Sequence, residues 1–302
     1  MASLTAVVDA VSSQEFQAGL RWGGGLGLIG VLFALIWRRW RQGLLPIGGP
    51  IVAVAAAVAM SVTRSLSTTV GAGLCLLAVA GALFSLSRRI ALLPALTALP
   101  GAWLIGRSGP SGTGWVEPIA VTTVALVGPV VAGFEEDTEK SPIPMWLFTV
   151  SVAGAWLTLP DTEEVLVLLG ALSMPALLTW PLRMLRLGSV GAYTLPGLYI
   201  WVVMWGGRGR ESSIFGALAA LGLLAAAPIA AWMAGRGRVS SYGLIGFFLV
   251  FGHAGLVIFV TRVAGFQVGP RSALLFAFSA VVTALMLWFA VERSVGKAPD
   301  RH

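Results

Sequence analysis

The sequence has very little charge. Only 11% of its 302 residues are Asp, Glu, Lys or Arg, whereas 57% are hydrophobic. A soluble domain is about one quarter charged, so this composition excludes an ordinary soluble domain. The chain also lacks the alternating pattern of a transmembrane β-barrel, because its apolar runs are continuous. These two absences leave an all-α protein whose helices lie in a lipid bilayer.

Sequence motifs and residues that would identify a reaction are missing as well. There is no Gly-x-x-x-x-Gly-Lys-Ser/Thr phosphate-binding loop, so the chain encodes no ATPase engine. The apolar runs contain no lysine for a retinal Schiff base, and their single histidine excludes bis-histidine haem within one chain. No Cys and His residues have the spacing of a zinc site. We therefore expect no cofactor and no metal.

The chain has one cysteine, Cys75, which lies inside an apolar run and cannot form an internal disulfide. Thiolate chemistry is unfavourable in apolar surroundings. The sequence predicts Cys75 to be a small buried hydrophobic residue.

What the chain does have is a succession of long apolar runs. A transmembrane helix needs about 20 residues, and runs of roughly this length fill the sequence. Their approximate ranges are 17–37, 43–62, 66–87, 90–106, 117–133, 143–160, 165–182, 188–206, 213–234, 241–262 and 272–292. We predict an all-α, polytopic transmembrane helix bundle of about 11 spans (10–12). It forms a single domain, 17–293, between an amino-terminal tail, 1–16, and a carboxyl-terminal tail, 294–302.

The amino-terminal tail contains apolar residues at helical spacing, which is typical of a short helix lying at a membrane interface. These residues are Leu4, Val7, Val8 and Val11. No positively charged segment precedes the first apolar run, so we expect no cleavable signal peptide.

The basic residues are scattered between the apolar runs, so the net charge of +7 does not form a nucleic-acid-binding patch. With the amino terminus outside, thirteen of the 20 Arg and Lys residues fall in inside segments and seven in outside segments. Cytoplasmic loops carry an excess of Arg and Lys. We therefore predict a multi-pass protein of the cell inner (plasma) membrane with a cytoplasmic carboxyl terminus. Its expected partners are the lipid bilayer and other membrane proteins or a second copy of itself, with no nucleic acid.

Small residues recur in the apolar runs. Gly23 and Gly27 have the small-xxx-small spacing that lets two helices approach closely, and we interpret them as packing residues. The segments starting at Leu99 and Leu195 both read Leu-Pro-Gly in similar surroundings. This likeness is either a chance match or the trace of a parallel repeat, in which the two helices run in the same direction.

His253 is an ionisable residue near the middle of an apolar run, in Phe-Gly-His-Ala-Gly. A neutral imidazole in lipid needs hydrogen-bond partners for both nitrogens. The flanking Gly252 and Gly255 would let a neighbouring helix supply one. His253 is either a structural link between helices or a proton-handling or ligand-binding group.

Two acidic stretches remain. Asp161, Glu163 and Glu164 lie on the predicted outer side and could bind a cation or substrate. Asp161 followed three residues later by Glu164 has the form of a capping box, and first-turn carboxylates favour the helix dipole, so we prefer capping. The inside segment 135–140 lacks the paired aspartates of a magnesium–pyrophosphate site. We interpret it as a solvated loop.

No motif identifies a substrate or a reaction. Helices interrupted by proline, frequent glycine and a lone intramembrane histidine favour a transporter or flippase-like permease. The alternatives are a non-catalytic membrane subunit of a larger complex and a membrane-embedded enzyme acting on a lipid-linked substrate. The scarcity of carboxylates within the apolar runs argues against a proton-coupled transporter.

Overall fold

The computed structural model describes residues 2–40, 44–63, 66–86, 92–109, 116–137, 143–159, 162–179, 182 and 184–207. Within these ranges the regular elements are all helices, so the predicted all-α class is confirmed for this part of the chain. The apolar runs at 213–234, 241–262 and 272–292 lie outside the described residues. So does His253, whose role stays a prediction.

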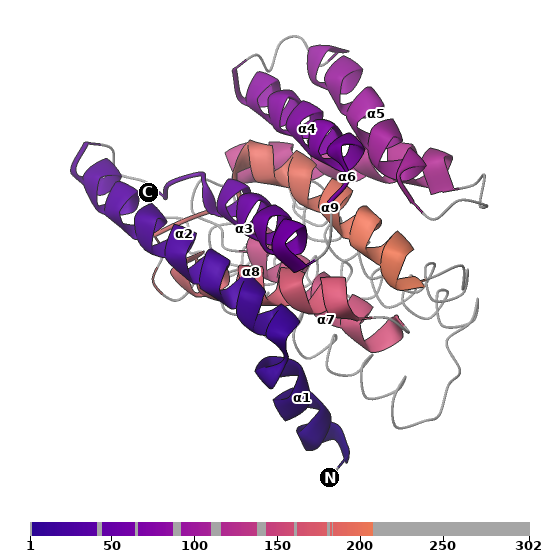
Figure 1. Cartoon of the computed structure of the whole chain (residues 1–302). Coiled ribbons are helices and arrows are strands. Elements are labelled where there is room, and N and C mark those ends of the chain that lie inside the picture. Colours follow the sequence, from indigo (N-terminus) through magenta and orange to yellow (C-terminus); the bar gives the residue numbers. More distant parts are fainter. Residues whose placement is uncertain are drawn as a thin grey trace, which may run out of the picture.

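The described residues form nine helices in succession (Figure 1). These are α1 (Ala2–Ser12), α2 (Gln14–Trp40), α3 (Gly48–Thr63), α4 (Thr68–Leu86), α5 (Leu92–Arg107), α6 (Val116–Asp137), α7 (Ile143–Thr158), α8 (Glu163–Thr179) and α9 (Gly188–Gly207). Each apolar run predicted up to residue 206 coincides with one of the helices α2 to α9. The short helix expected in the amino-terminal tail is present as α1. Its place at a membrane interface stays a prediction.

Two of the described helices are long and apolar enough to cross a membrane, by length and composition. They are Gln14–Arg38, within α2, and Thr68–Leu86, which is α4. Other helices are shorter than the roughly 20 residues that a full crossing needs: α3, α5 and α7 have 16 residues each and α8 has 17. The number of spans in the whole chain therefore stays a prediction.

Close contacts at glycines define the directions of the helices. Gly19 of α2 lies against Val167 of α8, and Gly27, two turns later, lies against Met174, so α2 and α8 run parallel. Gly23 lies between these two contacts, where an added Cβ would be 2.5 Å from the carbonyl oxygen of α8 Ala171. The packing role predicted for Gly23 and Gly27 is thus confirmed.

Helices α4 and α6 run antiparallel to α9. Along α4, Leu77 contacts Gly197 whereas Gly81, one turn later, contacts Val190 of α9. On α6, Gly128 lies against Tyr193 of α9, and the following turns approach the first residue of α9. These directions are the ones expected if each helix turns back on the one before it.

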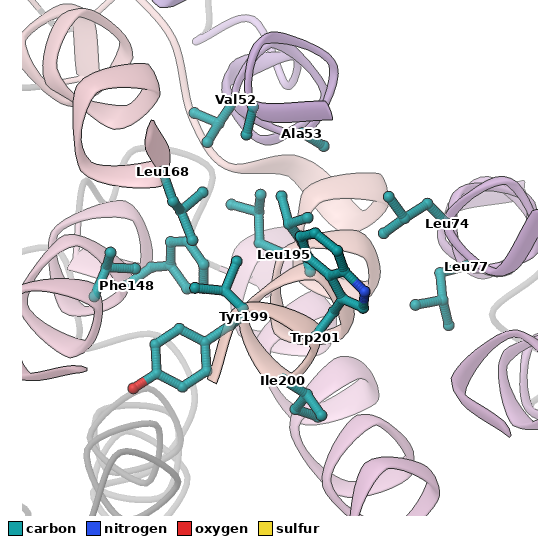
Figure 2. Close-up of a cluster of buried hydrophobic side chains, with 14 of the residues drawn as sticks. Val52, Ala53, Leu74, Leu77, Phe148, Leu168, Leu195, Tyr199, Ile200 and Trp201 are labelled. Atoms are coloured by element: carbon teal, nitrogen blue, oxygen red, sulfur yellow. The ribbon is translucent and has the colours of Figure 1, made fainter. Parts of the chain in front are cut away.

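Helix α9 lies at the centre of the described bundle (Figure 1) and packs against α3, α4, α5, α6 and α8. Nearly all of its residues are buried, as expected for a helix that is apolar all round. Tyr199 of α9 reaches α7, where its hydroxyl donates to the carbonyl oxygen of Ser151 at 3.1 Å. Its ring also packs edge-on against Phe148, with 6.0 Å between centroids. Figure 2 shows this core, which includes Leu168 of α8 and Leu77 of α4.

The two Leu-Pro-Gly segments lie in α5 and α9. Gly101 of α5 and Gly197 of α9 both contact Leu77 of α4. Because α5 and α9 are each antiparallel to α4, they run in the same direction, as predicted. A parallel four-helix repeat extending beyond these contacts stays a prediction.

A second likeness concerns the linkers that precede α3 and α9. Both carry the pattern Trp-x4-Leu-x2-Gly, beginning at Trp40 and Trp180. The leucines of the two patterns, Leu45 and Leu185, form an isolated parallel β-bridge, and the final glycine of each pattern begins the helix that follows. The units α2–linker–α3 and α8–linker–α9 therefore resemble each other and lie side by side.

Cys75 corrects a prediction, because it is exposed on α4. The buried face of α4 follows helical spacing and consists of Val70, Gly73, Leu74, Leu77, Ala80 and Gly81. Cys75 points away from this face. An apolar run alone does not reveal which of its residues face other helices.

Candidate functional site

Glu135 is a buried carboxylate on the last turn of α6, and only 1% of its surface is exposed. We predicted a solvated loop at 135–140, and this is wrong for Glu135. Helix α6 continues to Asp137 and carries Glu135 into the contact between α6 and the beginning of α9. A charged side chain in such a place needs partners, because its removal from water is costly.

The partners of Glu135 come from the residues around the first turn of α9. The backbone N–H of Gly188 donates to Glu135 Oε2 at 3.4 Å. Arg186 Nη1 lies 3.9 Å from the same oxygen and donates to the Glu135 backbone carbonyl at 2.6 Å. Because Gly188 is the first residue of α9, the carboxylate also lies at the positive end of this helix dipole.

Gly188 has a φ of 75°, which side-chain-bearing residues adopt rarely. A Cβ at this position would also collide with the backbone carbonyl of Pro46. Both conditions require glycine here. This residue allows α9 to begin directly against the linker that precedes α3.

Backbone hydrogen bonds join the two linkers, and we call residues 44–49 and 184–188 the linker pair. Leu45 donates its N–H to the carbonyl of Met184 at 3.1 Å and accepts from Arg186 N–H at 2.9 Å. Gly48 N–H donates to the Arg186 carbonyl at 2.8 Å. Arg186 therefore holds the linkers together through its backbone and contacts Glu135 through its side chain.

Burial raises the pKa of Glu135 to about 7, because removal from water penalises the charged form. The positive charge of Arg186 and the N–H groups of Gly188 and Leu187 lower this pKa, but by less than burial raises it. Glu135 can therefore gain or lose a proton near neutral pH.

The site also contains hydrogen-bonding capacity that its protein neighbours leave unused. In the described part of the chain, neither Glu135 Oε1 nor Arg186 Nε has a hydrogen-bond partner, although both atoms are buried. Buried polar atoms without partners are rare in folded proteins. The pair thus combines a titratable carboxyl with a free acceptor and a free donor.

Glu163 and Glu164, predicted as candidates, lie in the first turn of α8, at the end of that helix far from the linker pair. Glu163 is exposed and Glu164 is buried. Their place in the first turn agrees with the dipole interpretation. Asp161 lies outside the described residues, so its capping role stays a prediction. The structure does not bring Glu163 or Glu164 to Glu135.

Sequence reasoning missed Glu135 and Arg186 because both follow the end of an apolar run, where charge usually indicates a loop. One signal was available. The buried positions of α6 recur at Val124, Val127 and Val131, and Glu135 continues this helical spacing by one more turn. Within the described residues, no group of three His, Cys, Asp or Glu could hold a metal ion.

No model of a known protein family matches the chain, and no curated protein matches it in sequence.

Proposed function

We propose that the chain is a multi-spanning membrane protein that acts as a transporter or flippase-like permease. Its outer surface supports placement in lipid. Much of α2 exposes large apolar side chains, including Leu28, Ile29, Leu32, Phe33 and Ile36. A continuous apolar surface of this kind on a protein in water would require a cover. The hydrocarbon of a bilayer provides one.

Aromatic residues at one end of the bundle support the same placement. Exposed tryptophans lie near the ends of α5 (Trp103) and α9 (Trp205). By the directions of the helices, these two positions share one end of the bundle. Trp103 donates to Glu117 at 3.1 Å, and the Arg107 guanidinium lies 5.1 Å from its ring centroid. Tryptophan with arginine is typical of a membrane–water interface, and this is the end predicted to face outward.

The permease proposal depends on one observation, the buried carboxyl of Glu135 with the partly buried Arg186 beside it. Ionisable groups enclosed by transmembrane helices are costly and usually belong to a substrate or ion pathway. The sequence seemed to lack such a carboxylate, which argued against a proton-coupled transporter. Glu135 weakens this objection: it lies two residues beyond the apolar run 117–133, but it is buried where α6 meets the central helix α9.

Reconstitution of the full chain into vesicles of phosphatidylethanolamine and phosphatidylglycerol tests this function. One set of vesicles contains the pH dye pyranine and is exposed in turn to amino acids, sugars, nucleosides and organic acids. A second set carries a fluorescent phospholipid, whose movement between leaflets is followed by quenching with dithionite. We expect the wild type to move at least one of these classes and Glu135→Gln to slow that movement tenfold or more.

Vesicles that remain as tight as protein-free ones to every probe would contradict the permease proposal. Purification from native membranes in mild detergent then decides between the alternatives. A stoichiometric membrane partner would indicate a non-catalytic subunit of a larger complex. Turnover of a lipid-linked substrate by the purified chain would indicate an enzyme.

A further inference from the structure

The linker pair lies at one end of the described bundle, and Glu135 contacts it. Arg186 connects the two features, because its backbone bonds to Leu45 and Gly48 while its side chain contacts Glu135. The start of α9 is connected in the same way, since Gly188 donates to Glu135. Glu135 therefore contacts both the linkers and the first turn of the central helix.

Arg186 is the charged side chain that faces Glu135 in the described part of the bundle. Helices α3, α4, α7 and α9 contain no Asp, Glu, Lys, Arg or His. Helix α8 carries Glu163 and Glu164 at its distant end, and on α2 Arg38 contacts the carbonyl of Leu182. Glu136 and Asp137 follow Glu135 on α6. Among the described residues, Arg186 is the positively charged side chain that contacts Glu135, and Glu135 Oε1 accepts no hydrogen bond from them.

The protonated and charged forms of Glu135 consequently favour different arrangements. The neutral form suits the closed packing, because burial of the Glu135 carboxyl penalises only its charged form. The charged form is better solvated if the linkers separate and admit water. One linker leads into α3 and the other leads into α9. Separation of the two linkers would therefore also move α3 and α9 apart at this end.

We propose that Glu135 is a proton-operated latch: its protonated form keeps the linker pair closed, and loss of the proton opens this end of the bundle. The O–H bond of the Glu135 carboxyl breaks, the proton passes to water, and the carboxylate becomes hydrated beside Arg186. This inference rests on the proposed permease function and deepens it, because it names the proton as the coupling ion. The distribution of Arg and Lys predicts that the linker end is cytoplasmic, so the proton is released there.

Hydrogen exchange of the full chain in lipid nanodiscs tests the latch between pH 5 and pH 8. The observable is the protection factor of peptides that cover the linker pair. A protection factor corrects for the pH dependence of chemical exchange. The pKa of Glu135 falls from about 7 toward 4.5 when the carboxyl is hydrated. Protection of the linker pair should therefore decrease as the pH rises from 5 to 7, by up to about tenfold per pH unit. It should level off above pH 7. Peptides from α4 should show no such trend.

Two variants complete the test. Glu135→Gln cannot lose a proton, so its linker pair should stay as protected at pH 8 as the wild type at pH 5. Glu163→Gln is the matched control, because it makes the same chemical change at an exposed position on α8, and it should keep the wild-type profile.

A wild-type linker pair whose protection does not change with pH would overturn the latch, even if Glu135→Gln failed to fold. The vesicle assay separates the two proposals. Transport with a pH-independent linker pair would refute the latch and leave the permease. A pH-dependent linker pair in vesicles that move no probe would refute the permease and leave the latch as a conformational switch.

Discussion

Glu135 gives the bundle a titratable group at the point where α6, the linkers and α9 meet. Its ordinary pKa of 4.5 is raised to about 7 in the folded protein, chiefly by burial. Between these values the folded chain binds a proton that the unfolded chain does not. This group therefore contributes stability that is fully present below pH 4.5 and is lost as the pH rises through 7.

We predict that the free energy of unfolding of the wild type decreases as the pH rises from 5 to 7. The slope attributable to Glu135 is up to about 1.4 kcal/mol per pH unit. Thermal or denaturant unfolding in detergent at a series of pH values measures it, and Glu135→Gln should remove this slope. Stability of the wild type that rises with pH over the same window would show that the carboxylate form is preferred.

Some residue-scale features could be predicted from the sequence and others could not. The packing role of Gly23 follows from spacing alone, because small residues four apart share one helix face. Burial of Glu135 depends on how far α6 extends, and exposure of Cys75 on which face of α4 meets its neighbours. Both require knowledge of the partner helices.

At the scale of elements, the parallel pair α2 and α8 is held by backbone contact along a line of glycines. An added methyl group at Gly23 would lie 2.5 Å from the carbonyl oxygen of Ala171, which cannot move without shifting α8. We predict that Gly23→Ala destabilises the protein by about 1–3 kcal/mol. Thermal unfolding of the purified variant in detergent measures this.

Gly25 provides the matched control for this prediction. It lies on the same helix, but no heavy atom of another helix comes within 4 Å of an added Cβ. Gly25→Ala should be neutral or stabilising by up to about 1 kcal/mol, because alanine is the better helix former. Equal effects of the two substitutions would contradict the parallel packing of α2 against α8.

Helix positions were predictable because each apolar run is continuous and the short segments between runs are polar or rich in glycine and proline. The end of α6 was not, since acidic residues usually indicate a loop. The linker pair could not be predicted either, because its hydrogen bonds join segments far apart in the sequence, around Leu45 and Leu185.

At the scale of the whole molecule, composition indicates a membrane protein, and the described bundle agrees in its apolar exposed surface. The two like units α2–linker–α3 and α8–linker–α9 give the molecule an internal correspondence that the Leu-Pro-Gly likeness alone did not reveal. Their contact at the linker pair and at the α2–α8 seam places the buried Glu135 beside the boundary between the units. This arrangement suits a protein in which these two units move relative to each other.

Placement of the bundle in a bilayer can be tested at Cys75. It is the single cysteine of the chain and is exposed on α4, so a nitroxide can be attached without any substitution. After reconstitution into vesicles, electron paramagnetic resonance compares collisions of the label with oxygen, which concentrates in lipid, and with a nickel chelate, which stays in water. A label at Glu163→Cys, in a Cys75→Ala background, is the water-exposed control. We predict that the Cys75 label collides mainly with oxygen and the Glu163→Cys label mainly with nickel. Equal access of the nickel chelate to both would contradict the membrane bundle.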